Sequence, residues 1–217
     1  MEYAWVLGTK FLLVFSSLFV IVDPFAIIPT FLALTKNTPK QNLEKIIRTA
    51  CMTGAEILIF FQLFGNAVFH LLGIKLDAFK VAGGVLLFLT ALDMIKAKEL
   101  DQTYSSEVSE AEDKRDISIV PLAIPLLAGP GSITSVIVFS NDPQGTFVEN
   151  TAISITSIIL VFVLSYIVLK YSLWIKTFLG KSGISVMQRI MGILLAAISL
   201  QMIVEGLVAL FKSAMGT

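Results

Sequence analysis

Long apolar stretches alternate with short charged ones along this chain of 217 residues. A bilayer core about 30 Å thick is crossed by roughly 20 apolar residues of helix, each rising about 1.5 Å. Charged residues divide the chain into six stretches of about that length. The predicted spans are Phe11–Thr35, Thr49–Gly73, Leu76–Ile95, Ile117–Ser140, Asn150–Leu169 and Ile190–Phe211. The pattern therefore predicts an all-α transmembrane protein with six spans.

The third and sixth predicted spans share a sequence pattern. Twelve residues from Gly84, ending in Asp93-Met-Ile, align without gaps on twelve residues from Gly192 that end in Gln201-Met-Ile. Matched leucines carry little weight, because leucine-rich spans align easily by chance. The matched glycine, the polar residue nine positions later and the Met-Ile pair favour an internal repeat. Coincidence between two hydrophobic helices is the alternative.

Nearly the same offset, shortened by two residues, brings Pro24 of the first span onto Pro130 of the fourth. The repeat unit therefore contains three spans. An odd number of crossings makes the second copy enter the membrane from the opposite side, so we expect two inverted halves related by a pseudo-two-fold axis in the membrane plane. The halves would be residues 1–98 and 117–217, joined by an acidic linker at 99–116.

The first and fourth spans each carry helix-breaking residues near the middle. Asp23-Pro24 lies in the first span, and Gly129-Pro130-Gly131 lies in the fourth. Proline removes a backbone donor and pushes the preceding residue out of helical geometry. Broken backbone at membrane depth persists only where it is buried in protein or faces a wet cavity. We therefore expect both spans to be discontinuous; a plain kink is the alternative.

A break of this kind points a helix N-terminus, with free N–H groups, into the protein interior, where it suits a carboxylate. Asp23 beside the first break would cap the helix, or hold an ammonium group or a coupling cation. Ser132 and Thr134 would add hydroxyl donors at the second break. The predicted substrate-binding residues are Asp23, Pro24, Phe25, Ala26, Gly129, Pro130, Gly131, Ser132 and Thr134.

Four further polar residues in or beside the spans are candidates for coupling or gating. Glu56 lies seven residues into the second span, where an unpaired carboxylate costs several kcal/mol. Arg189, at the start of the sixth span, is its candidate partner; a bound proton or cation is the other. Asp93 and its repeat mate Gln201 lie toward opposite ends of their spans. A surface ion pair with nearby lysines is an equal alternative for Asp93.

Composition narrows the classes of function. Hydrophobic residues make up 56% of the chain and charged residues 15%, which fits helices that face lipid. The formal net charge is zero, so we expect no nucleic-acid partner. One cysteine and one histidine, with no HExxH or CxxC pattern, predict no metal site. We expect no cofactor apart from a coupling H⁺ or Na⁺, and no enzymatic activity.

The distribution of Lys and Arg predicts the orientation. Twelve of the sixteen basic residues follow the first, third and fifth spans, and four lie on the opposite side. Because basic residues concentrate in cytoplasmic loops, we expect a multi-pass protein with both termini outside the cytoplasm. The acidic run at 99–116 is read as a solvated cytoplasmic linker.

Several motifs resemble the MarC family of integral membrane proteins, across essentially the whole chain. The matching motifs are Ala123-Ile-Pro-Leu-Leu-Ala-Gly-Pro-Gly-Ser-Ile-Thr134, Asp23-Pro24 with Pro29, Phe79-Lys-Val-Ala-Gly-Gly84, Asp93-Met-Ile, Arg189-Ile-Met-Gly192 and Gln201-Met-Ile. The chain departs from the family pattern at Ala26, where members often carry glycine. The resemblance implies a six-span carrier of small neutral amino acids, such as glycine or alanine, in a prokaryotic cell membrane.

The leading hypothesis is an alternating-access transporter whose substrate, a small zwitterion, binds at the two helix breaks. The alternative within transport is a channel or an exporter for another small polar solute. An intramembrane enzyme is the alternative from another class, but the chain lacks both HExxH and the paired aspartate motifs of the presenilin type. A helical scaffold would not explain two breaks. Apart from the substrate and the bilayer, the sequence indicates no partner, and it leaves the oligomeric state open.

Overall fold

The computed structural model describes residues 2–36, 38–96, 118–143 and 145–215. All regular structure within these ranges is helical. The helices are α1 (Glu2–Val22), α2 (Ile27–Leu34), α3 (Lys40–Leu72), α4 (Leu76–Ile95), η1 (Ser118–Leu127), α6 (Pro130–Ser140), α7 (Phe147–Lys170) and α8 (Ser172–Met215). The predicted acidic linker at 99–116 lies outside the described residues.

Five of the helices are long and apolar enough to cross a membrane: α1, α3, α4, α7 and the part of α8 from Ser182 onward. The remaining predicted span, the fourth, consists of the two shorter helices η1 and α6. The all-helical transmembrane class is thus confirmed. The count of six spans and the inverted repeat stay predictions.

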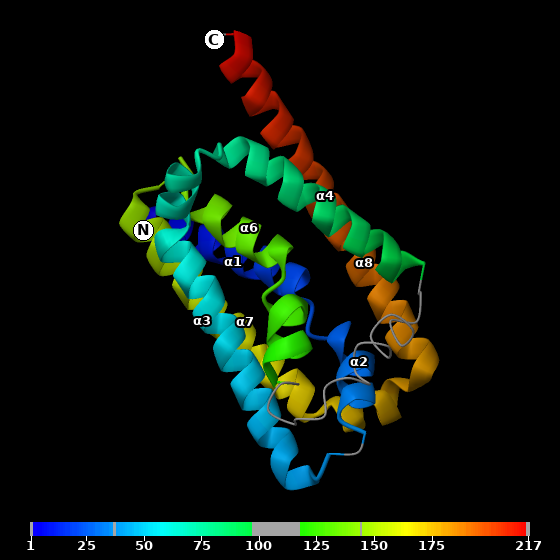
Figure 1. Cartoon of the computed structure of the whole chain (residues 1–217). Helices are drawn as coiled ribbons and strands as arrows, with labels where there is room; N and C mark the ends of the chain where they lie inside the picture. The colour runs from blue at the N-terminus through cyan, green and yellow to red at the C-terminus, as the bar shows by residue number, and fades with distance from the viewer. Residues whose placement is uncertain (1, 37, 97–117, 144, 216–217) are drawn as a thin grey trace.

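The helices form three groups (Figure 1). Helices α3 and α7 lie side by side along one flank, and α4 and α8 along the other, while α1, α2, η1 and α6 lie between them. Both ends of the described chain lie toward the same end of the bundle. Helix α8 bends near its start, at Gly180, whose φ of 65° is a left-handed conformation that glycine adopts at little cost.

Helices α4 and α8 approach closely through small residues. The Cα of Gly84 on α4 lies against Ile203 and the Ser199 carbonyl of α8. Gly192 on α8 in turn lies against Met94 and the Ala91 carbonyl of α4. Without side chains at these two positions, the backbones of α4 and α8 can approach closely.

The observed helix bounds agree with those predicted from the apolar pattern for α4 but not for α1 and α3. Helix α4 spans the predicted residues Leu76–Ile95 without change. Helix α1 begins at Glu2, nine residues before the predicted start, and α3 begins at Lys40. The charged residues that set the predicted limits do not end these helices, because an α-helix continues into the aqueous layer wherever its backbone is free of breakers.

The candidate site lies at two helix breaks

The first break follows from the chemistry of Asp23 and Pro24. Asp23 N–H donates to the Phe19 carbonyl at 2.9 Å, the last α-helical bond of this segment. A residue before proline is disfavoured in the α region, so the chain must leave the helix here. Asp23 adopts a left-handed φ of 40°, which aspartate tolerates better than most residues. Four residues later the chain resumes as α2.

The Asp23 carboxylate closes this turn with only one of its two oxygens. Oδ1 accepts a hydrogen bond from the Ala26 N–H at 3.2 Å, immediately before α2 begins. The residue is 4% exposed, and Oδ2 has no hydrogen-bond partner within the described chain. A buried ionised oxygen without a donor is costly, so this site requires a proton, a cation, a water or a polar ligand.

The second break follows a wide helical segment. In η1 the hydrogen bonding is of the π type, as in the Ala128 N–H donating to the Ala123 carbonyl at 2.9 Å. Gly129 is extended, with φ −77° and ψ 169°, and α6 begins at Pro130. Proline at the first helical position has no N–H to leave unsatisfied. The first free amide hydrogens of α6 therefore belong to Gly131 and Ser132.

Of the residues predicted to bind at the second break, Gly131, Ser132 and Thr134 are buried, Gly129 is half-buried and Pro130 is exposed. Both predicted hydroxyls have a partner in this structure. The Ser132 hydroxyl donates to the Gly129 carbonyl at 2.9 Å, and the Thr134 hydroxyl donates to the Pro130 carbonyl at 2.7 Å. Thr134 also packs against Gly83 of α4. The oxygens of the two hydroxyls can therefore still accept a hydrogen bond from a ligand. To donate a hydrogen bond to a ligand, either hydroxyl would first have to break its bond to the backbone carbonyl.

Gly131 has a packing role that the sequence did not disclose. A Cβ built at this position would overlap the Leu87 side chain of α4. The missing side chain therefore lets α4 approach α6 beside the break. A larger residue at Gly131 would disturb this packing before it altered any ligand contact.

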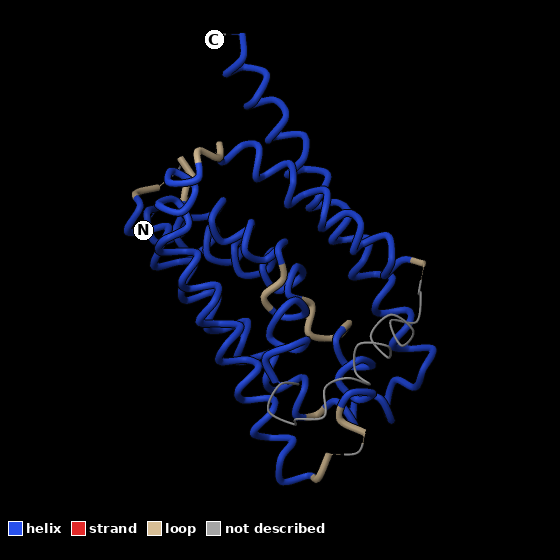
Figure 2. The backbone as a smooth tube through the Cα atoms, in the orientation of Figure 1, coloured by secondary structure: helices blue, strands red, loops and turns tan. Residues whose placement is uncertain are grey.

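Both breaks lie in the middle part of the bundle (Figure 2). Val22 and Ile27, on either side of the first break, belong to the same buried cluster as Leu127 and Ala128, which precede the second. Phe25 is half-buried beside them, with its ring edge-on to Phe19. The structure thus brings the residues predicted from two distant segments into one region.

Gln188 of α8 also reaches this region, although sequence reasoning missed it. Its Nε2 lies 3.4 Å from the Ala26 carbonyl, a long hydrogen bond to backbone that the first break leaves free. The only signal in the sequence was an uncharged polar residue at the beginning of a long apolar stretch. Through this contact α8 touches the first break.

The four predicted coupling residues do not gather at the breaks. Glu56 on α3 and Arg189 on α8 are exposed, and neither forms an ion pair within the described residues. Asp93 is exposed near the end of α4. Gln201 donates to Glu205 at 2.8 Å, away from both breaks. Their role in coupling stays a prediction without a structural link to the site.

Sequence reasoning also missed a set of buried polar side chains. Gln62 of α3 is 1% exposed, and neither its amide nitrogen nor its oxygen has a partner in the described structure. The other buried polar atoms in this condition are the hydroxyls of Thr30, Thr151, Ser154 and Ser157. On α7 the buried residues Asn150, Ser154, Ser157 and Ser165 recur every three, four or eight positions, a helical periodicity that the sequence did contain.

Polar contacts close one end of the bundle. Lys10 of α1 forms an ion pair with Asp142 at 2.9 Å and donates to Asn150 Oδ1 at 2.7 Å. The Asn150 amide in turn donates to the Asp142 carbonyl at 2.8 Å. This network ties α1 to the connection between α6 and α7.

Within the described residues, no group of three or more His, Cys, Asp and Glu side chains is placed to hold a metal ion.

Comparison with known proteins gives one consistent result. The family described as "MarC family integral membrane protein" matches residues 8–211. A UPF0056 membrane protein of Methanocaldococcus jannaschii is 37% identical over 91% of this chain and 95% of its own length. The corresponding figures for YvbG of Bacillus subtilis are 36%, 91% and 94%, and for YhcE of Escherichia coli 34%, 91% and 91%. No solved structure matches the chain.

Proposed function

Because the chain belongs to the MarC family of integral membrane proteins, we propose that it is a membrane transporter of small neutral amino acids. Glycine and alanine are the expected substrates. They would bind at the two helix breaks and be carried across the membrane by alternating access. The observation that carries the proposal is the combination at these breaks of an unpartnered carboxylate oxygen with the N-terminus of α6.

A zwitterion matches these two groups. The N-terminus of α6, with the amide hydrogens of Gly131 and Ser132, suits a substrate carboxylate. The free Oδ2 of Asp23 suits a substrate ammonium group, since a buried carboxylate gains most from a cationic donor. A small side chain fits best, because Ala26 and Gly131 both lie in packed surroundings.

Alternating access requires a path from the site to each side of the membrane. The buried and unpartnered polar groups of Gln62 on α3 and of Ser154 and Ser157 on α7 support such a path, because polar atoms inside a membrane protein often line a hydrated pathway. The ion pair of Lys10 with Asp142 joins α1 to the connection between α6 and α7, and it would have to break if these segments move apart during transport. A coupling H⁺ or Na⁺ would bind at Asp23 when the substrate leaves.

Transport by the reconstituted protein tests this proposal. Proteoliposomes carrying the full chain should accumulate labelled glycine or alanine when a proton or sodium gradient is imposed. Saturable uptake above the equilibrium level is the expected result. Absence of uptake and exchange over a panel of neutral amino acids would contradict the proposed substrates. Unsaturable flux that ignores the gradient would point to a channel instead.

The variant Asp23→Asn tests the role of the carboxylate. Asparagine tolerates positive φ and can still accept from the Ala26 N–H, so the turn is expected to persist. Loss of the charge-assisted contact should lower accumulation about tenfold or more. Asp77→Asn, which changes an acid in the first turn of α4, is the matched control and should leave transport unchanged. Equal transport by both variants would remove Asp23 from the site.

A further inference from the structure

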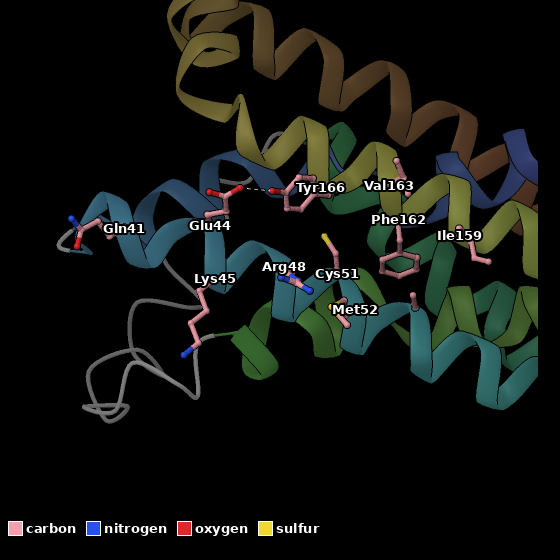
Figure 3. Close-up of a pocket in the computed structure, with 11 residues that line it drawn as sticks. Gln41, Glu44, Lys45, Arg48, Cys51, Met52, Ile159, Phe162, Val163 and Tyr166 are labelled. Carbon is pink, nitrogen blue, oxygen red and sulfur yellow. Dashed lines mark hydrogen bonds between the residues drawn. The ribbon is translucent and has the colours of Figure 1, made fainter.

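A groove of about 750 Å³ opens on the flank of the bundle, between α3 and α7 (Figure 3). The two helices run antiparallel here, so the beginning of α3 lies beside the end of α7. Figure 3 shows charged and polar side chains at this end of the groove and apolar ones at the other. The groove therefore changes from polar to apolar along the helix axes.

The polar end carries a surplus of positive charge. The single acid, Glu44, accepts hydrogen bonds from Tyr166 at 2.8 Å and from Lys170 at 3.0 Å. Lys45 and Arg48 line the same end, and neither forms an ion pair within the described part of the chain. Three cations thus surround one anion whose contacts are already made. An anionic group would find two cations available there.

The apolar end of the groove is lined by partly exposed side chains at its sides and by a buried side chain at its base, which is called the floor here. Met52, Ile159 and Val163 line it and are each about half exposed. The floor is Phe162, which is buried and whose ring packs against Gly54, where α3 has no side chain. Met52 lies one helical turn beyond Arg48, and the lining of the groove on α3 ends at Ala55, roughly 10 Å along the helix from Arg48. This helix is long enough to cross the membrane.

We propose that this groove binds one phospholipid of the bilayer with an anionic headgroup. The headgroup phosphate lies between Lys45 and Arg48, and one acyl chain lies along Met52, Ile159 and Val163. Both helices are membrane spans, so the apolar part of the groove runs parallel to the acyl chains and its cationic end lies at the level of the headgroups. The polar-to-apolar order of the groove and its charge both match a lipid of this class.

Native mass spectrometry of the full chain, titrated with single lipids, tests the proposal. Phosphatidylglycerol supplies headgroup charge and acyl chains, phosphatidylcholine supplies the same chains without net charge, and inorganic phosphate supplies the anion alone. We expect one tight phosphatidylglycerol, about 30-fold weaker binding of phosphatidylcholine, and no binding of phosphate at matched concentrations. Equal affinity for the two lipids would overturn the proposal.

Two pairs of variants separate the groove from general attraction of lipid. Lys45→Gln with Arg48→Gln removes the two cations and should lower phosphatidylglycerol affinity about 30-fold. The matched control, Lys36→Gln with Lys176→Gln, removes the same charge from the same end of the bundle outside the groove and should change little. If both double variants bind alike, the groove is not the site.

The second pair tests the apolar end. Val163→Trp should fill the groove and displace the lipid, whereas Ile167→Trp, one turn along α7 and outside the groove, should not. The two positions are similarly exposed, at 49% and 43%. A second copy of this chain is the competing occupant. If Val163→Trp instead dissociates a dimer that forms equally with either lipid, that result overturns the proposal.

Discussion

The turn at Asp23 gives a prediction whose magnitude follows from the structure. Asp23 contributes to the turn in two ways. Its backbone adopts a left-handed φ of 40°, and its side chain accepts a hydrogen bond from the Ala26 N–H. Asp23→Asn keeps both, since asparagine tolerates this φ and retains a side-chain oxygen. Asp23→Ala keeps neither. Both variants lack the charge of Asp23. The difference between their free energies of unfolding therefore measures what the side chain contributes to the stability of the turn.

The expected difference is the sum of two costs. Losing a capping oxygen costs about 1 kcal/mol, and placing alanine in the left-handed region costs about 1–2 kcal/mol. The free energy of unfolding of Asp23→Ala should thus lie about 2–3 kcal/mol below that of Asp23→Asn. For a chain of this size, the unfolding temperature should differ by about 4–12 °C.

Thermal unfolding in one detergent, followed by circular dichroism, measures this difference. Asp23→Asn should be at least as stable as the unmodified protein, because it also removes the buried charge of the unpartnered Oδ2. Equal unfolding temperatures for the alanine and asparagine variants would refute the reasoning, since the turn would then need no side chain. An asparagine variant well below the unmodified protein would show that the charge itself is compensated in the fold.

Three further outcomes follow from single contacts. Gly131→Ala should destabilise the protein by about 1–3 kcal/mol, and less than additively when combined with Leu87→Ala, as thermal unfolding of the two single variants and the double variant would show. Lys10→Gln breaks both contacts of that amine and should speed hydrogen exchange in the connection between α6 and α7; unchanged exchange would contradict this. Gln62→Leu should raise stability by about 1–3 kcal/mol and slow transport, whereas the exposed Gln41→Leu should do neither.

The sequence predicted the breaks well because their causes are local. Steric exclusion by Pro24 acts on the residue directly before it, and Asp23 leaves the helix in the structure as expected. Pro130 begins α6 for the same kind of reason. The limits of α4 were also predictable, since its charged residues Asp77, Lys80 and Asp93 lie near its two ends and the residues between them are almost all apolar.

Contacts between distant residues were not accessible in this way. Nothing local to Gly131 indicates that Leu87 occupies the space beside it. Nor does the sequence around Glu56 tell which face of α3 points outward, because that helix is apolar on nearly all sides. The spacing of Ser154 and Ser157 in the sequence indicates a polar face on α7. The sequence does not indicate which helix packs against that face.

The sequence by itself determined that the chain is a helical membrane protein with two helix breaks, because length, hydropathy and proline sterics act within a few residues of each position. Only the tertiary structure decided that residues beside the two breaks share one buried cluster, that Asp23 keeps one oxygen buried without a partner, and that α3 and α7 leave a groove between them. Those features depend on how helices far apart in the sequence pack. Packing is set by the shapes of both surfaces at once, and neither segment contains that information alone.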